Sequence, residues 1–376
     1  MENLVLYRKY RPQKFADVAG QDHVTVTIQN EIKSGHIAHA YLFSGPRGCG
    51  KTTTARIIAK AVNCLNRKEG SAEPCNKCAN CLEISSGRAI DLIEIDAASH
   101  RGIDDIRELR EGIKFAPTKL KYKVFIIDEC HQLSKDASNA LLKTLEEPPA
   151  HAIFILATTE LHKILPTILS RCQRFDFRKL ALPELAARLQ KLADAEGVKV
   201  EKAALELVAL SSGGSVRDSE SLLGQVLVSG NGGGKTAIKA EDIRQILGMT
   251  EIKSVGEFAG LLSQNKTAAA VNYLNDIVEN GYDVHEYAKS VLGYLRQALI
   301  LSIIGAKDAK NAKNDNFMIT GLTDEEFELL REQTIAMGET KIKKTIETFL
   351  SAQEKIRYSP IPQLPLELAI VEACAV

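Results

Sequence analysis

Short apolar runs that alternate with helical patterns organise the first half of the chain. Continuous apolar strands between helices are typical of a parallel sheet that is buried on both faces. The pattern therefore predicts an α/β domain over residues 1–178, with helices on both faces of the sheet. The expected strands are Ala40–Ser44, Asp91–Asp96, Lys123–Asp128, Ala152–Thr159 and Arg174–Phe177.

The strand pattern stops after Pro183, and helical periods follow at 183–196, 201–212 and 216–229. Ser215, with Asp218 three residues later, is an N-cap pair that marks the start of the third helix. These periods predict a three-helix domain over residues 179–243. Ser229–Gly234 is typical of a turn or short flexible segment.

Helical patterns resume from Glu241 and continue to the end of the chain. They predict an all-α third domain over residues 244–376. The polar stretch Ala306–Asn316 within it is expected to be a solvated loop.

Composition changes this picture little. The 376 residues suit two or three domains, and 48 Lys and Arg balance 48 Asp and Glu. No overall charge draws the protein to nucleic acid or membranes, so any contact with DNA must come from a local patch. The apolar runs are shorter than the roughly 20 residues of a membrane span, and Met1–Asn3 opens no secretory signal. We therefore expect a cytoplasmic protein without a membrane partner.

A glycine-rich segment supplies the first candidate chemistry, because residues 45–52 fit G-x-x-x-x-G-K-[ST] between an apolar strand and the helical run Thr53–Lys60. In that context, backbone N–H groups at a helix N-terminus bind phosphate. Lys51 would contact the β- and γ-phosphates, and the Thr52 hydroxyl would bind Mg²⁺. A chance glycine turn is the alternative. The predicted nucleotide-binding residues are Gly45, Pro46, Arg47, Gly48, Cys49, Gly50, Lys51, Thr52 and Thr53.

A second Gly-Lys-Thr, at residues 234–236, fails this test. The spacing places Ser229 where the first glycine belongs, and no strand precedes it. It is better interpreted as part of a linker.

Two acids end the apolar strand at Val124–Ile127, at the edge of a parallel sheet where ligands bind. Asp128 would complete the Mg²⁺ site with Thr52, and Glu129 would position or deprotonate the attacking water. Helix capping is the alternative role for such acids. Thr159, at the end of the next strand, could hydrogen-bond the water or the γ-phosphate.

Four cysteines form a separate cluster along the chain, at Cys64, Cys75, Cys78 and Cys81. Four closely spaced thiolates match a closed structural zinc site. An iron–sulfur cluster is the alternative, but in ferredoxins the fourth cysteine follows the other three and precedes proline. The other cysteines, Cys49, Cys130, Cys172 and Cys374, are expected to be small buried residues.

Together these motifs resemble an AAA+ ATPase of the clamp-loader type, and further segments are similar to the gamma/tau subunits of bacterial DNA polymerase III. The resemblance covers the first two predicted domains. Over the third it rests on length and helical character alone. The segments that carry it are Tyr7–Pro12 with Phe15–Val18, His39–Gly45, Leu141–Pro149, Ser170–Cys172 and Gly214–Asp218.

The resemblance implies roles for residues that their spacing alone does not explain. Arg171 looks like an arginine finger that acts in trans, on the nucleotide of a neighbouring subunit; a surface ion pair is the alternative. Arg217 resembles the arginine with which the helical domain, or lid, contacts phosphate. The zinc cysteines match an insertion in the family. Tyr7, Arg8, Arg11, Pro12 and Val18 resemble the segment that lines the adenine pocket.

The implied function is that of an ATP-hydrolysing motor subunit of the replicative clamp loader, within the DNA polymerase III holoenzyme. Residues 244–376 would form an oligomerisation collar. The implied partners are other subunits of a pentameric hetero-oligomer, a sliding clamp and primer–template DNA, for which Arg101 is a candidate contact or else a solvated charge. A helicase loader, a branch-migration motor and a non-catalytic loader stator are the alternatives, although stators lose the Lys and Thr that Lys51 and Thr52 retain.

Overall fold

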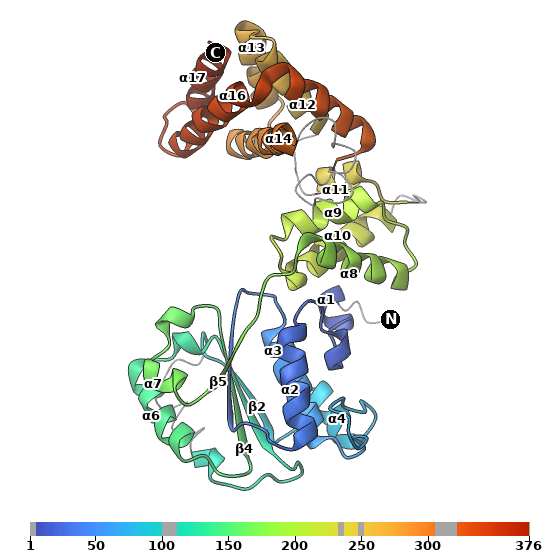
Figure 1. Cartoon of the computed structure of the whole chain (residues 1–376), viewed down its shortest axis with the longest axis vertical. Helices are drawn as coiled ribbons and strands as arrows, with labels where there is room; N and C mark the ends of the chain where they lie inside the picture. The colour runs from blue at the N-terminus through green and yellow to red at the C-terminus, as the bar shows by residue number, and fades with distance from the viewer. Residues whose placement is uncertain (1–4, 100–110, 232–236, 247–251, 305–321, 376) are drawn as a thin grey trace. The chain divides into compact units, whose positions relative to one another are not determined.

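The computed structural model describes residues 5–99, 111–231, 237–246, 252–304 and 322–375. It divides into two compact units, Met1–Arg188 with Ser212–Ser221, and Leu189–Ser211 with Leu222–Val376. Figure 1 shows the elements of both. Arg101, the Gly-Lys-Thr at 234–236 and the polar stretch 306–316 lie outside the described residues.

The first unit is built on a five-stranded parallel sheet in the order β2-β3-β4-β1-β5. This confirms the predicted α/β fold. The observed limits differ from the predicted ones by one residue at some ends: Asp91, Thr159 and Phe177 lie just outside the strands, and Gln173 lies inside. The strands are β1 (Ala40–Ser44), β2 (Leu92–Asp96), β3 (Lys123–Asp128), β4 (Ala152–Thr158) and β5 (Gln173–Asp176).

Helices cover both faces of the sheet, as Figure 1 shows for α2 and α3 on one side and α6 and α7 on the other. Successive residues of β1 point to opposite faces: Tyr41 joins one apolar cluster and Leu42 the other. Both faces of the sheet are therefore buried against apolar side chains. Burial on both faces explains why the strands are continuous apolar runs. The helices of this unit are α1 (Leu6–Lys9), α2 (Asp22–Ser34), α3 (Lys51–Asn63), α4 (Ala79–Ser85), α6 (Lys135–Glu146) and α7 (Pro166–Leu169), with 3₁₀ turns η1 (Phe15–Asp17), η2 (Cys130–Gln132) and η3 (Leu161–Lys163).

Helices follow the sheet, as predicted. The predicted start of the third is confirmed: α10 begins at Val216, and the Ser215 hydroxyl accepts a hydrogen bond from the backbone N–H of Asp218 at 3.3 Å. The predicted turn is wrong at its first residues, because α10 continues through 229–231. Gly230 lies in the last turn of α10, and glycine is common at the C-terminal ends of helices. The three helices are α8 (Leu182–Ala195), α9 (Lys202–Ser211) and α10 (Val216–Asn231).

The remaining described residues of the second unit are mainly helical, as the all-α prediction requires. Phe258, Tyr287 and Phe349 are among the largest side chains of one buried apolar cluster. A capping box of Thr323 and Glu326 starts the longest helix, and Gly338, with φ of 70°, kinks it. The helices are α11 (Ala240–Ile246), α12 (Ile252–Ser263), α13 (Thr267–Glu279), α14 (Val284–Ile304), α16 (Asp324–Ile356) and α17 (Leu364–Cys374).

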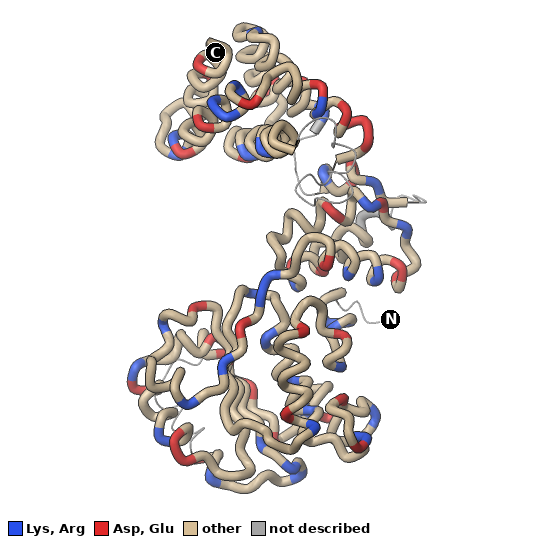
Figure 2. Tube along the Cα trace, viewed as in Figure 1, with Lys and Arg blue, Asp and Glu red and all other residues tan. Residues whose placement is uncertain are grey.

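Figure 2 shows acidic and basic residues interspersed along both units. This matches the equal totals of the two charges in the sequence. Within the described ranges, none of the helices has the length and apolar character needed to span a bilayer.

Candidate functional site

The glycine-rich segment forms a tight loop between β1 and α3, as predicted. Gly48 has φ of 75°, and a Cβ at this position would lie 2.2 Å from the Ser215 hydroxyl. Gly50 has φ of 104° and is the N-cap of α3. Positive φ favours glycine at both positions, and the contact with Ser215 leaves no room for a Cβ at Gly48, so the loop can curl around a ligand at the start of α3. The loop carbonyl of Gly48 also accepts a hydrogen bond from the N–H of Val216 at 3.2 Å, which ties it to the start of α10.

Lys51 is the first residue of α3, and only 6% of it is exposed. Its ammonium group donates to the carbonyls of Gly45 at 2.8 Å and Pro46 at 2.9 Å. Both acceptors are neutral carbonyl groups. They therefore do not balance the positive charge of the buried Lys51 ammonium. An anionic phosphate is a suitable partner for such a group.

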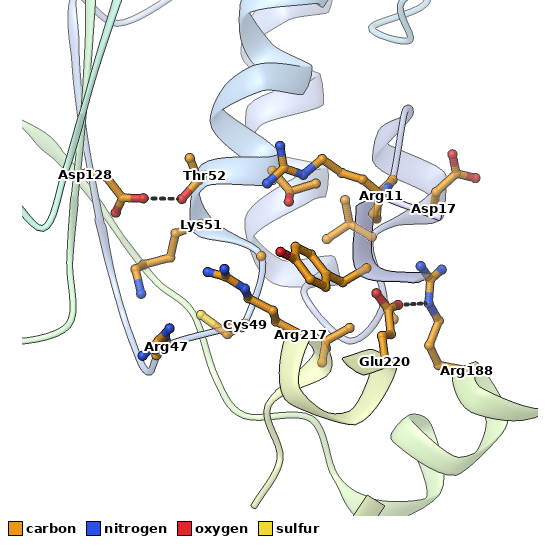
Figure 3. Close-up of a pocket in the computed structure, with 18 residues that line it drawn as sticks. Arg11, Asp17, Arg47, Cys49, Lys51, Thr52, Asp128, Arg188, Arg217 and Glu220 are labelled. Carbon is orange, nitrogen blue, oxygen red and sulfur yellow. Dashed lines mark hydrogen bonds and ion pairs between the residues drawn. The ribbon is translucent and has the colours of Figure 1, made fainter. Parts of the chain in front are cut away.

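Thr52 and Asp128 meet at the edge of the sheet, where the Thr52 hydroxyl donates to Oδ2 of Asp128 at 2.6 Å (Figure 3). Both residues line the same pocket as the loop. Hydroxyl and carboxylate oxygens are ligands that Mg²⁺ accepts. The predicted pair therefore fits a magnesium ion beside the phosphates.

Glu129 lies directly after β3 in a left-handed conformation with φ of 48°, which is unusual for a residue with a side chain. Its carboxylate accepts hydrogen bonds from the Thr159 hydroxyl at 2.9 Å and the Thr159 N–H at 3.2 Å. Thr159 thus contacts Glu129, whereas the sequence suggested a contact with water or phosphate. These two hydrogen bonds orient the Glu129 carboxylate.

A histidine that the sequence analysis missed completes this cluster. The ring of His131 lies 3.4 Å from the Glu129 carboxylate and 3.0 Å from the Thr158 hydroxyl, and its side chain is 4% exposed. His131 lies only two residues after Glu129 in the sequence. That closeness to the two acids is the one sequence feature that could have identified it as part of the site. The buried ring restricts the positions that the Glu129 side chain can adopt.

One pocket contains most of the predicted nucleotide-binding residues. Gly45, Pro46 and Arg8 are absent from the lining, and the carbonyls of Gly45 and Pro46 accept hydrogen bonds from Lys51. Sequence reasoning missed Asp17, Ala19, Arg188, Val216 and Glu220. The lining residues are Tyr7, Arg11, Pro12, Asp17, Val18, Ala19, Arg47, Gly48, Cys49, Gly50, Lys51, Thr52, Thr53, Asp128, Arg188, Val216, Arg217 and Glu220.

The end of the pocket away from Asp128 contains an ion pair between Arg188 of α8 and Glu220 of α10 (Figure 3). Nε of Arg188 lies 3.0 Å from the carboxylate, and the guanidinium also donates to the carbonyl of Tyr10 at 2.9 Å. Burial raises the pKa of Glu220 above the ordinary value for a carboxyl group, although Arg188 opposes this shift. The pair links both helices to the N-terminal segment.

Arg217 lies over the ring of Tyr7, with its guanidinium carbon 4.9 Å from the ring centre. Hydrogen bonds from Arg8 and Arg217 lower the pKa of the Tyr7 hydroxyl. The arginine therefore lies within the pocket, packed against the N-terminal segment by a cation–π contact.

Arg171 does not line this pocket. Its guanidinium bonds the Glu146 carboxylate at 2.7 Å and the Thr167 carbonyl at 2.8 Å, and about a third of the side chain is exposed. Within one chain it therefore forms the ion pair that was the alternative to an arginine finger.

The four predicted cysteines come together, with their Sγ atoms within 4.8 Å of one another. Backbone N–H groups of Lys77 and Cys78 donate to the sulfur of Cys75 at 3.4 and 3.3 Å and hold its pKa down, at about 6. Such bonds favour the thiolate, the form that binds metal. The set therefore fits a four-coordinate metal ion. Of the other cysteines, Cys49, Cys130 and Cys374 are buried as expected, and Cys172 is partly exposed.

The parallel sheet, the phosphate loop between β1 and α3, and the acids after β3 define a P-loop protein with the AAA+ fold. Comparisons with known proteins narrow this class. Residues 20–181 match a family described as DNA polymerase III, delta subunit. Residues 184–232 match the ATPase lid domain of the DNA polymerase III clamp loader subunit, and 238–376 match domain III of DNA polymerase III subunits gamma and tau.

Relatives of known sequence agree. DNA polymerase III subunit gamma of Buchnera aphidicola is 40% identical over 82% of this chain and 83% of its own length. DNA polymerase III subunit tau of Bacillus subtilis is 42% identical over the whole chain and 64% of its own length. The chain belongs to the gamma/tau subunit family of DNA polymerase III. It spans about two thirds of the length of the Bacillus relative.

Among solved structures, the Bacillus subtilis DNA clamp loader delta protein (YqeN) is similar with a TM-score of 0.40 and 14% identity, covering 93% of this chain and 99% of its own. A likeness at that level carries no information about function.

Proposed function

We propose that the chain is an ATP-hydrolysing motor subunit of a DNA polymerase III clamp loader. The observation that carries this proposal is the grouping of Lys51, Thr52, Asp128 and Glu129 at the carboxyl edge of the sheet, on a fold of the gamma/tau family. The reaction is hydrolysis of ATP to ADP and phosphate, with Mg²⁺ bound to the nucleotide.

The residues divide the chemical work in this proposal. Backbone N–H groups of residues 47–53 and the Lys51 ammonium would bind the phosphates, while Thr52 and Asp128 would hold Mg²⁺, which would neutralise phosphate charge. Glu129 orients the attacking water and takes up its proton. Because Thr159 holds Glu129 by two hydrogen bonds, a shift of Thr159 on nucleotide binding would release the acid toward the water.

Arg217 and the N-terminal segment provide the coupling to movement. Arg217 would contact phosphate from the start of α10, so the position of that helix would depend on the bound nucleotide. Tyr7, Arg11, Pro12 and Val18 would hold the base. Gly45, Pro46 and Arg8 would support these groups from outside the pocket wall.

Assembly completes the site in this proposal. Arg171 would leave Glu146 and act on the nucleotide of a neighbouring subunit, where a guanidinium matches the γ-phosphate oxygens. The C-terminal domain would form the collar. Its helix α17 exposes Leu364, Leu368 and Val371, at positions i, i+4 and i+7 of one face, and such a stripe suits a helix–helix interface.

The remaining parts of the proposal concern organisation and surroundings. We propose an ATPase domain at 1–178, a lid at 179–243 and a collar at 244–376, which the three family matches support. We also propose that the cysteine site holds zinc, that the protein acts in the cytoplasm, and that its partners are other loader subunits, a sliding clamp and primed DNA.

The decisive experiment measures ATP hydrolysis with and without partner loader subunits, sliding clamp and primer–template DNA. We expect primed DNA and clamp together to stimulate hydrolysis by the assembled loader. Nucleotide binding without hydrolysis in the complete assembly would favour a stator. Stimulation by a Holliday junction or a helicase, but not by the clamp, would favour another AAA+ motor.

A further inference from the structure

A carboxylate from the cysteine segment, residues 64–81, holds the N-terminal segment that lines the pocket. The Glu73 side chain accepts hydrogen bonds from the N–H of Phe15 at 2.9 Å and of Ala16 at 3.0 Å, one to each oxygen. The amide of Gln29 in α2 donates to the same carboxylate at 3.1 Å. Phe15 and Ala16 begin η1, where backbone N–H groups have no partner within the helix.

A second set of contacts holds the residue that precedes η1. Lys60 of α3 is 2% exposed, and its ammonium donates to the Gln13 carbonyl at 3.0 Å and the Gln13 side chain at 2.6 Å. The same ammonium donates to the side-chain oxygen of Asn76 at 2.8 Å. The amide nitrogen of Asn76 donates to the Gln13 carbonyl at 3.1 Å. Three parts of the chain therefore meet at one buried amine.

These contacts bracket the wall of the pocket. Arg11 and Pro12 line it directly before Gln13, and Asp17, Val18 and Ala19 line it directly after Phe15 and Ala16. Every described residue that lies between the two groups of lining residues, apart from Lys14, is thus bonded to Glu73, Lys60 or Asn76. The position of the wall depends on where the cysteine segment holds it.

The cysteines place both anchoring side chains. Glu73 precedes Cys75 by two residues, and Asn76 lies between Cys75 and Cys78 in a left-handed conformation with φ of 56°. A metal ion bound by four thiolates restricts the backbone around its ligands, because each ligand position is then fixed. A fixed backbone at residues 73–78 keeps the Glu73 carboxylate and the Asn76 amide within hydrogen-bonding distance of the N-terminal segment.

We propose that the cysteine segment positions the N-terminal wall of the nucleotide pocket through Glu73 and Asn76, so that metal occupancy raises nucleotide affinity. The inference rests on the proposed nucleotide site. Glu73 and Asn76 are positioning residues: they act on the ligand through residues 11–19 and not by contact with it. Their loss should therefore weaken binding more than it slows hydrolysis.

The first test is Glu73→Gln in the full chain, with affinity for a fluorescent ADP analogue as the measurement. An amide has one acceptor oxygen and presents an N–H₂ group to the second backbone donor, so one anchor is lost. We expect about tenfold weaker binding, in line with the loss of a charged hydrogen bond. In the assembled loader, KM for ATP should rise while kcat falls less than about twofold. Glu69→Gln, an exposed glutamate of the same segment, is the matched control and should bind like the wild type.

A second variant guards against a general folding defect. Asn76→Gly retains a residue that accepts positive φ and removes only the amide that bonds Gln13 and Lys60. It should also weaken binding severalfold, with the metal content of the purified protein unchanged. Wild-type affinity in both Glu73→Gln and Asn76→Gly would overturn the inference.

Metal removal provides the third arm. Wild-type protein stripped of metal with a thiol-specific reagent and chelator, then returned to Mg²⁺-containing buffer, should bind the ADP analogue about as weakly as Glu73→Gln. Zinc ions should restore binding in the wild type and have little effect in Glu73→Gln. Stripped protein that retains native affinity would contradict the inference, whereas wild-type protein that binds no nucleotide at all would contradict the proposed function instead.

Discussion

The two ends of the pocket are built in different ways. The phosphate end comes from one continuous segment, residues 47–53, together with Asp128 at the end of β3, which Glu129 follows directly. The opposite end combines an N-terminal segment, Arg188 of α8 and Glu220 of α10, which lie up to about two hundred residues apart in the sequence. The phosphate loop is thus a local structure, whereas the opposite end exists only once distant parts of the chain have packed.

The difference suggests a division of labour. In the proposed function, groups at the phosphate end would contact the atoms that react, so changes there should alter the rate of the chemical step. Groups at the opposite end would hold the part of the pocket wall proposed to receive the base, so changes there should alter nucleotide affinity. Measurements that separate kcat from KM can test this division directly.

The largest effect is expected at the phosphate end, for Lys51→Ala. The variant loses the buried cation that would bind both ground-state and transition-state phosphate charge, so kcat/KM in the assembled loader should fall by at least about 10³-fold. Steady-state ATPase assays measure this. Lys33→Ala, an exposed lysine near the end of α2, should behave as the wild type. Retention of even a tenth of the normal kcat/KM in Lys51→Ala would show that the loop is not the nucleotide site.

Glu129→Gln should separate chemistry from binding at the same end. The amide keeps the size of the side chain and can still accept from Thr159, but it cannot take a proton from water. We expect kcat to fall about 10²-fold or more, with nucleotide affinity within about twofold of the wild type. Single-turnover hydrolysis and equilibrium binding give the two numbers, and Glu147→Gln on the exposed end of α6 is the control. Equal losses in binding and turnover would count against a role in the chemical step.

The sequence predicted the two ends unequally, for a physical reason. At the phosphate end, Gly48 and Lys51 are recognisable because strand, loop and helix are contiguous in the sequence. Asp128 is recognisable because an acid there ends a buried apolar strand. At the other end, Arg188 and Glu220 occupy helical positions where charged residues are usually solvated. Nothing local indicates that packing buries them together, and their pairing depends on how α8 and α10 pack against the N-terminal segment.

The same reasoning applies to Thr159. Thr159, which directly follows β4, places its hydroxyl beside Glu129, whereas the sequence suggested a contact with water or phosphate. That contact involves a Glu129 whose backbone is in the left-handed region, with its carboxylate accepting from the Thr159 hydroxyl. A sequence pattern does not determine such a conformation for a glutamate, so the contact could be found only in three dimensions.

Changes to the ion pair between Arg188 and Glu220, at the end of the pocket opposite the phosphate loop, should give a smaller effect. The effect should be confined to nucleotide affinity and protein stability. Arg188→Met or Glu220→Leu alone leaves one buried charge without its partner, and each should weaken nucleotide binding about tenfold and lower the melting temperature. The double variant should recover much of the stability, because two apolar side chains can replace a buried pair. Thermal melts and ADP titrations of all four proteins form the cycle. Strictly additive losses would show that the two side chains act independently.

The smallest effect is expected for Arg171→Ala in the isolated chain, because Arg171 belongs to neither end of the pocket. Its guanidinium is bonded to Glu146 and Thr167 and is absent from the pocket lining, so nucleotide affinity of the single chain should stay within about twofold of the wild type. The assembled loader should respond differently, since hydrolysis there would depend on Arg171 from a neighbour. Mixing Arg171→Ala chains with Glu129→Gln chains measures that dependence: a site with an intact Glu129 hydrolyses ATP only if its neighbour supplies Arg171. Weakened binding in the isolated Arg171→Ala chain would instead mean that this arginine supports the pocket of its own subunit. Arg171 would then belong to the site of a single chain and not to the part completed by assembly.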